Sequence, residues 1–505
     1  MTNRTTLFLA SFLMLIAAGV GFMIRNGGVL GEWGGAFGYS KTELGAITGG
    51  GLAGFGLILL GASLITDRVG YRAILLGAFV SHLLSAAITL STAPVFDSAG
   101  RDAAFWCLYA GTFLFAIGNG LCEAAINPLV ADLYPERKTH YLNVLHAGWP
   151  GGLVLGGLLA YAFVGPDAKV ARLRWEIPMA MFLVPVACYG FLLLRARFPI
   201  SEVKAAGVTF SEMLRQFAQP LLLALLLLQA LVGYVELGTD SWIVEIMKPV
   251  MRGQAVLLII YTSVLMFALR FFAGPIVERI NPLGLLLVSS LAAAAGLYML
   301  GGASTGWAIL LAGTVYGIGK TFFWPTMLGV VGEQFPRGGA LTMGAVGAVG
   351  TLSAGFIAGP MIGYQQDYYA TSLLKTESAG TLERYQTDKA KAFLFLPKIT
   401  ALDGTKVAYL AEQNQIASAG AAKDTVESAE VVGKDRAAAD LKDWWAAAEP
   451  YAEQDRGWLQ SANLFGGRSA LRWTALVPVL MACGYFALVI YFWMRGGYRV
   501  AHLDT

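Results

Sequence analysis

Long apolar segments, separated by short polar loops, run through most of the chain. About 20 apolar residues cross the hydrocarbon core of a bilayer as a helix, and twelve segments reach or approach that length. They fall into two sets of six, so the pattern predicts an all-α membrane protein with twelve transmembrane helices in two six-helix bundles. The predicted spans are 6–26, 43–65, 72–92, 104–132, 140–164, 176–195, 220–245, 255–276, 282–301, 306–332, 340–363 and 471–494.

Polar stretches divide the chain into its expected parts. Residues 1–195 form the N-terminal six-helix bundle, and residues 196–219 form a linker. The C-terminal bundle takes residues 220–364 and 471–505, with an insert at 365–470 between spans 11 and 12. The insert is Ala-rich with alternating charges, which favours a few amphipathic helices. It either caps the mouth of the bundle or is a tolerated insertion.

Two tryptophans of the insert, Trp444 and Trp445, have two possible places. They dock on the protein, or they rest at the membrane interface, where tryptophan is enriched.

Lysine and arginine in the short loops set the expected orientation. With the N-terminus inside, the inner loops carry thirteen of these residues and the outer loops carry seven. We therefore expect a multi-pass protein of the inner (plasma) membrane with both termini and the linker in the cytoplasm. The insert then lies outside the cytoplasm.

Composition supports the membrane class and narrows the function. The chain is 56% hydrophobic and 14% charged, whereas soluble domains carry about 25% charged residues. A net charge of +3 argues against a nucleic-acid partner. The four cysteines lie in apolar segments without metal-ligand spacing. No Ser/His/Asp set, metal cluster or nucleotide loop is found, so we expect neither an enzyme nor a cofactor.

Short motifs recur in the two halves in the same order. Ala110-Gly111-Thr112 recurs as Ala312-Gly313-Thr314, and Tyr134-Pro135 recurs as Phe335-Pro336. Span 4 thus matches span 10, which predicts a parallel repeat of two six-span halves.

The segment from Gly61 to Arg72, GASLITDRVGYR, resembles the loop between spans 2 and 3 of the major facilitator superfamily. The resemblance implies the major facilitator fold and transport by alternating access. Asp67-Arg68 recurs as Glu278-Arg279 after span 8, and Arg270 lies two turns before Glu278. We expect these charges to form a cytoplasmic gate: Asp67, Arg68, Arg72, Arg270, Glu278 and Arg279.

Within that superfamily, the run from Glu123 to Pro128, EAAINP, resembles the span 4 motif of the fucose:proton symporter branch. The tract from Leu142 to His146 is similar to that branch as well. The resemblance implies that Glu123 takes part in proton coupling. The acidic residue that the branch has in span 1 falls on a glycine here, and Glu236 in span 7 is the expected substitute.

Polar residues inside apolar spans are the candidate site. Asn119, Glu123 and Asn127 are four apart, which puts them on one helix face. Ionisable groups at membrane depth are costly and usually functional. The alternative for Glu123 is permanent pairing with Arg25 or Lys320.

Further residues are expected to line the cavity beside these acids. Trp149 and Trp324 offer flat faces on which a sugar ring can stack, or they are ordinary tryptophans that face lipid or pack in the core. The expected substrate-binding set is Asn119, Asn143, His146, Trp149, Lys320, Trp324, Arg25 and Gln229.

The sequence thus predicts a proton-coupled secondary transporter for a small polar solute, a sugar first of all. The expected partners are that solute, protons and the lipid bilayer, and we expect a monomer. Two alternatives stay open. One is a transporter or exporter of an organic anion or zwitterion, motivated by the buried cations. The other is a nutrient sensor on the same scaffold that does not transport.

Overall fold

The computed structural model describes residues 3–39, 41–164, 168–251, 255–388, 390, 392–418 and 435–503, and these residues fold almost entirely into helices. Within these ranges nine helical stretches are long and apolar enough to cross a membrane, and Val256–Arg270 is a shorter apolar helix. Strands are absent from the described residues, where one isolated bridge joins Gln386 and Leu402. The predicted all-α membrane fold is confirmed.

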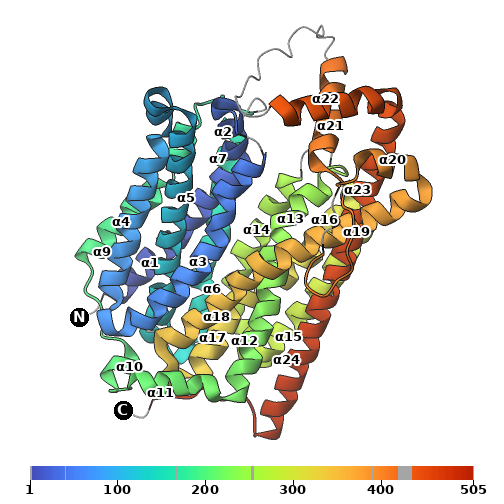
Figure 1. Ribbon diagram of the computed structural model, residues 1–505. Coiled ribbons are helices and arrows are strands. Elements are labelled where there is room, and N and C mark those ends of the chain that lie inside the picture. The colour runs from blue at the N-terminus through green and yellow to red at the C-terminus, as the bar shows by residue number, and fades with distance from the viewer. Residues whose placement is uncertain are drawn as a thin grey trace.

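The N-terminal bundle follows the predicted span order (Figure 1). Several spans are made of two or three consecutive helices. The elements are α1 (Arg4–Ile24), η1 (Arg25–Val29), α2 (Leu30–Phe37), α3 (Lys41–Val69), α4 (Tyr71–Leu90), α5 (Thr92–Leu133), η2 (Pro135–Arg137), α6 (Lys138–His146), α7 (Gly148–Phe163), α8 (Glu176–Ala180) and α9 (Leu183–Arg195).

The linker is helical too, and the C-terminal bundle repeats the scheme. The linker holds α10 (Glu202–Ala205), α11 (Phe210–Arg215) and η3 (Gln216–Ala218). The bundle holds α12 (Pro220–Gly233), η4 (Tyr234–Gly238), α13 (Thr239–Met247), α14 (Val256–Arg270), α15 (Ala273–Gly302), α16 (Gly306–Lys320), α17 (Phe323–Gln334), η5 (Pro336–Gly338), α18 (Gly339–Ser353), η6 (Ala354–Ala358), α19 (Gly359–Glu377) and α24 (Leu476–Met494).

The helices of spans 11 and 12 run on into the insert. The expected limits at 364 and 471 fall inside α19 and α23 (Ala452–Thr474), because both helices continue past the membrane span and pack against each other. Beyond them lie α20 (Ala379–Tyr385), α21 (Gly404–Ser418), α22 (Asp435–Ala448) and η8 (Glu449–Tyr451). Residues 419–434 of the expected insert lie outside the described residues.

The insert has a small core of its own. Leu374, Tyr385 and Leu459 are buried there, and Trp444 packs against Tyr385. The Trp444 indole N–H donates to the carbonyl of Arg384 at 2.8 Å. Trp444 therefore docks on the protein, which was the first of its two expected places.

Close glycine contacts reveal the repeat in three dimensions. If Gly19 carried a Cβ atom, that atom would lie only 2.9 Å from the Cα of Gly152, so α1 and α7 approach closely. In the other half, a Cβ on Gly233 would lie 2.7 Å from the Cα of Gly350, between α12 and α18. Small residues permit such approach in membranes. The first and fifth spans of each half thus meet in the same way.

A π-helical turn interrupts the first span of each half. It is η1 in span 1, which begins at Arg25, and η4 in span 7, which contains Glu236. Such turns in α-helices often occur at functional sites. Both interruptions place a charged residue at a break in the regular helix.

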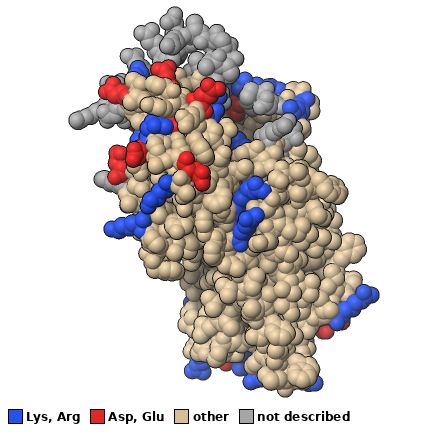
Figure 2. Space-filling view, turned by 90° about the vertical axis from the view of Figure 1, so that its right-hand side faces the viewer, with Lys and Arg blue, Asp and Glu red and all other residues tan. Residues whose placement is uncertain are grey.

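The two ends of the molecule differ. We call the end with the linker and the C-terminus the linker end, and the end with α20–α22 the insert end; they lie at the bottom and top of Figure 1. Toward the insert end the ribbons of the bundles lie apart, whereas at the linker end they meet. On the face in Figure 2, charged side chains gather mainly toward the two ends, and a broad band between carries few of them. That distribution suits a bilayer around the band.

Candidate functional site

A polar chain begins at Glu123 in the middle of α5. The Asn127 amide N–H donates to Glu123 Oε2 at 2.6 Å. Asn127 Oδ1 lies 2.9 Å from His146 Nε2 at the end of α6. Because an amide oxygen only accepts, the His146 ring donates here from Nε2. The Glu123 carboxylate is 4.0 Å from the same ring nitrogen. Spans 4 and 5 thus share one acid, one amide and one imidazole.

Arg270, at the end of α14, continues this chain into the other half. Its guanidinium donates to the His146 carbonyl at 2.6 Å and to the Thr321 carbonyl at 2.7 Å. Its third contact is an ion pair with Glu236 Oε1 at 3.1 Å. The backbone N–H of Trp324 donates to the second Glu236 oxygen at 3.3 Å. One continuous network therefore runs from Glu123 through Arg270 to Glu236.

The members of this network are withdrawn from the surface of the protein. The exposed fraction is 8% for Glu123, 5% for Glu236 and 1% for Arg270. Lipid offers no partner for a charge, so buried charges need partners within the protein. Both acids face the interior between the bundles rather than acyl chains.

Lys320 and Arg25 do not pair with Glu123, contrary to the alternative that the sequence allowed. Lys320 forms an ion pair with Asp240, at 2.7 and 2.5 Å from its two carboxylate oxygens. Span 7 supplies that acid and span 10 the lysine, so both groups belong to the C-terminal bundle. The cation nearest to Glu123 through the network is instead Arg270.

The expected solute-binding residues are only partly brought together. Asn143 is buried and donates to Thr326 Oγ1 of span 10 at 3.1 Å, while its own Oδ1 has no partner among the described residues. Gln229 is fully buried, and a Cβ on Gly350 would touch both its amide and the Trp324 ring. Trp149 instead packs on Phe22 of α1. These amides and Trp324 lie beside the network.

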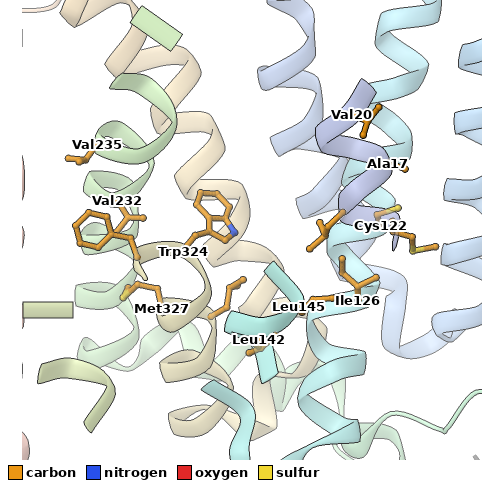
Figure 3. Close-up of a cluster of buried hydrophobic side chains, with 14 of the residues drawn as sticks. Ala17, Val20, Cys122, Ile126, Leu142, Leu145, Val232, Val235, Trp324 and Met327 are labelled. Atoms are coloured by element: carbon orange, nitrogen blue, oxygen red, sulfur yellow. The ribbon is translucent and has the colours of Figure 1, made fainter. Parts of the chain in front are cut away.

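Figure 3 shows buried apolar side chains that both bundles contribute to the core. Ile126, Leu142 and Leu145 come from the N-terminal bundle, while Met327 and Trp324 come from the C-terminal bundle. Ile126 and Leu145 directly precede Asn127 and His146 in the chain, and a low local dielectric strengthens the electrostatic interactions of such buried polar groups.

Asn119 lies elsewhere than expected. Its Oδ1 is 3.0 Å from His82 Nε2, and His82 Nδ1 is 2.7 Å from the Tyr189 hydroxyl. This group lies inside the N-terminal bundle, between spans 3, 4 and 6. His82 was not singled out from the sequence, because it stands alone in an apolar span.

The expected gate charges separate into two places. Asp67 Oδ2 accepts from the backbone N–H of Ala340 at 3.0 Å, and Glu278 pairs with Arg137 at 2.6 Å. Both contacts join the two bundles at the linker end. Arg270 does not pair with Glu278: it is buried in the central network, where it pairs with Glu236. Arg68, Arg72 and Arg279 are exposed at the linker end.

One gate residue escaped the sequence analysis. The buried carboxylate of Glu333 accepts from the backbone N–H of Thr139 at 3.1 Å, from its hydroxyl at 2.6 Å and from the Tyr498 hydroxyl at 2.8 Å. Thr139 belongs to the other half, so Glu333 helps to hold the bundles together. The repeat offered a signal: Glu333 stands before Phe335-Pro336 as Asp132 stands before Tyr134-Pro135.

Two helical bundles with a buried polar network between them define the class of membrane transporters with two repeated halves. The comparison with family models identifies the particular family. The model of the Major Facilitator Superfamily matches residues 7–363, and the chain belongs to this family of membrane transporters. The predicted family is confirmed, and this family is made of transporters, not enzymes. Transporters of this family bind small-molecule substrates in a lipid membrane.

Solved structures share the fold at low sequence identity. The E. coli fucose:proton symporter FucP is 18% identical with a TM-score of 0.56, over 72% of this chain and 92% of its own. The human organic anion transporter MFSD10 is 15% identical with a TM-score of 0.53, over 75% and 96%. A bacterial homologue of the human lysosomal transporter Spinster, inward-facing, is 15% identical with a TM-score of 0.60, over 99% and 98%. No curated protein matches the sequence.

Proposed function

We propose that the chain is a proton-coupled secondary transporter that moves a small polar solute by alternating access, with Glu123 as the proton carrier and Glu236 as its partner acid in the other half. The observation that supports this proposal is the network from Glu123 to Glu236 through Arg270. The two acids of this network belong to different halves, so a change in the charge of one acid changes the strength of the contact between the halves.

Arg270 supplies the coupling in this scheme. It donates to the His146 carbonyl of the N-terminal bundle, and its positive charge attracts both Glu236 and Glu123. A ligand shifts an equilibrium only by its differential affinity for the two states. A proton on Glu123 removes the attraction to Arg270 and loosens one tie between the halves. Protonation therefore favours opening at the linker end.

A sugar is the first candidate solute. The amides of Asn143 and Gln229 have polar atoms without a partner in the described part of the chain, and Trp324 adds an aromatic ring beside them. Hydroxyl groups pair with amides, and a sugar ring stacks on an indole. The fold shared with a fucose:proton symporter supports the same choice.

An organic anion is the second candidate, because the cation Arg25 has no acidic partner among the described residues. The fold shared with an organic anion transporter is compatible with that solute class.

The orientation that we propose puts the linker end in the cytoplasm of a cell whose plasma membrane holds the protein as a monomer. The excess of Lys and Arg in the loops at that end supports it. Protons that enter from the insert end then reach Glu123 before the gate at the linker end opens.

The test is uptake into proteoliposomes that hold the purified wild-type protein. Radiolabelled solutes chosen by a thermal-shift screen of sugars, organic acids and amino acids are offered with and without an inward proton gradient. The proposal expects accumulation that collapses when a protonophore is added. Displacement by neutral monosaccharides identifies a sugar transporter, and displacement by carboxylates identifies an anion transporter. Binding without any flux would contradict transport and indicate a sensor.

A further inference from the structure

Arg25 is a buried cation that the central network does not use. It begins the π-helical turn η1, and its exposed fraction is 2%. Among the described residues, its side chain makes one hydrogen bond, from Nη2 to the Ser85 hydroxyl at 3.1 Å. Nε and Nη1 have no hydrogen-bond partner among the described residues, and no carboxylate of that part of the chain pairs with the guanidinium. A buried charge in this condition is costly unless something compensates it.

Aromatic rings compensate only part of that cost. The guanidinium carbon lies 4.0 Å from the centre of the Phe115 ring and 5.7 Å from the centre of the Phe182 ring. These contacts favour a cation electrostatically. They provide no hydrogen-bond acceptor for the N–H groups of Nε and Nη1, which lie in the plane of the guanidinium.

Hydroxyl groups of α4 and α5 lie around Gly111, next to Ser85: a Cβ built on Gly111 would overlap the Thr89 hydroxyl. Ser85 uses its own hydrogen on the carbonyl of Gly111 at 2.7 Å, so toward Arg25 it is an acceptor. Thr89 lies one turn further along the same face of α4, and Thr112 directly follows Gly111 on α5. The hydroxyls of Thr89 and Thr112 are buried and have no partner among the described residues.

We propose that Arg25, Thr89 and Thr112 form a binding site for a small monoanion inside the N-terminal bundle. A carboxylate or a halide accepts charge-assisted hydrogen bonds from the guanidinium and ordinary ones from the two hydroxyls. The site is separate from the proton pathway: Phe115 precedes Glu123 by two helical turns, which is about 12 Å along the helix. The bound anion has two possible sources, a free inorganic anion and the carboxylate of a transported solute. Only the second source rests on the proposed function.

Thermal unfolding of the full-length protein in detergent tests the site without any proton gradient. Sodium formate, acetate and chloride are titrated against a buffer whose only anion is a bulky sulfonate. Binding to the native state raises the Tm with concentration. We expect this rise for the wild type and no rise for Arg25→Met. In the sulfonate buffer, Arg25→Met should also unfold at a higher temperature than the wild type, because it removes the buried charge that lacks an acidic partner.

Two further variants keep the test decisive if Arg25→Met does not fold. Thr112→Val loses one donor and should weaken the apparent affinity about tenfold. Arg174→Gln removes an arginine at the surface, where it pairs with Glu176, and should respond like the wild type. A response to formate and acetate alone assigns the site to an organic carboxylate, and a response to chloride as well assigns it to small monoanions in general. An unchanged Tm in the wild type, or an equal rise in Arg25→Met, would overturn the site, whatever the fate of proton-coupled uptake.

Discussion

The two halves of the molecule share a fold but handle buried charge in opposite ways. In the C-terminal half, Glu236 pairs with Arg270 and Asp240 pairs with Lys320, so each of the two acids of span 7 has its own base. In the N-terminal half, Glu123 is held by an amide and an imidazole. Arg25, a buried cation of that half, lies over aromatic rings and pairs with no acid of the described residues.

This difference indicates where ligands act. Ion pairs whose charges cancel, such as these two, can persist in every state and give their half a stable frame. A half with an acid that lacks a base can take up a proton without first breaking an ion pair. The N-terminal half is therefore the one that responds to protons, and Arg270 carries the response across the boundary.

The largest expected effect is the loss of one partner of the buried pair. Arg270→Met leaves the Glu236 carboxylate buried and unpaired, which should cost about 3–5 kcal/mol of stability. Thermal or denaturant unfolding in detergent measures it. The double variant Arg270→Met with Glu236→Gln should recover most of that loss. If the single and double variants are equally destabilised, the loss does not come from an unpaired Glu236 carboxylate, and the ion pair with Arg270 is not what stabilises it.

A smaller effect is expected at the second pair. Asp240 is 23% exposed at its side chain, so after Lys320→Met the orphaned carboxylate can reach water more easily than Glu236 can. The loss of a charge-assisted hydrogen bond should cost about 1.5–3 kcal/mol. The same unfolding measurement checks it, with Arg270→Met alongside. A cost above that of Arg270→Met would reverse the ranking of the two pairs.

Glu123→Gln should scarcely change stability. The Gln carbonyl can still accept from Asn127, and no ion pair is broken, so we expect a change below about 1.5 kcal/mol. Glu236→Gln is the matched control and should cost more, because it leaves Arg270 without its acid. Equal losses in the two variants would mean that the halves do not differ as proposed.

The smallest effect is expected at the surface of the gate. The Arg137–Glu278 pair is more than half exposed on the Glu278 side, at 64%, and such pairs contribute about 0–1 kcal/mol. Glu278→Gln should leave the Tm nearly unchanged while it increases labelling of a cysteine placed between the bundles at the linker end. A large fall in Tm with unchanged labelling would assign this pair a structural role instead.

Much of the fold could be predicted from the sequence, because apolar length and the repeated motifs depend on local pattern. The site was harder. Spacing put Asn119 on one face with Glu123, yet each step of four residues turns about 40° around the helix. Over two steps from Asn127 this carries Asn119 toward His82 instead of His146. The partners of Arg270 and Lys320 depend on how spans 7, 8 and 10 pack and on the π-helical turn at Glu236, and no periodicity encodes either.

The most direct test compares two assays on one preparation of Glu123→Gln in proteoliposomes. One assay measures exchange of labelled for unlabelled solute at equal pH, and the other measures accumulation driven by a proton gradient. The account predicts that exchange continues while accumulation falls to the level without a gradient. Full accumulation by Glu123→Gln would contradict the role of this carboxylate as the proton carrier.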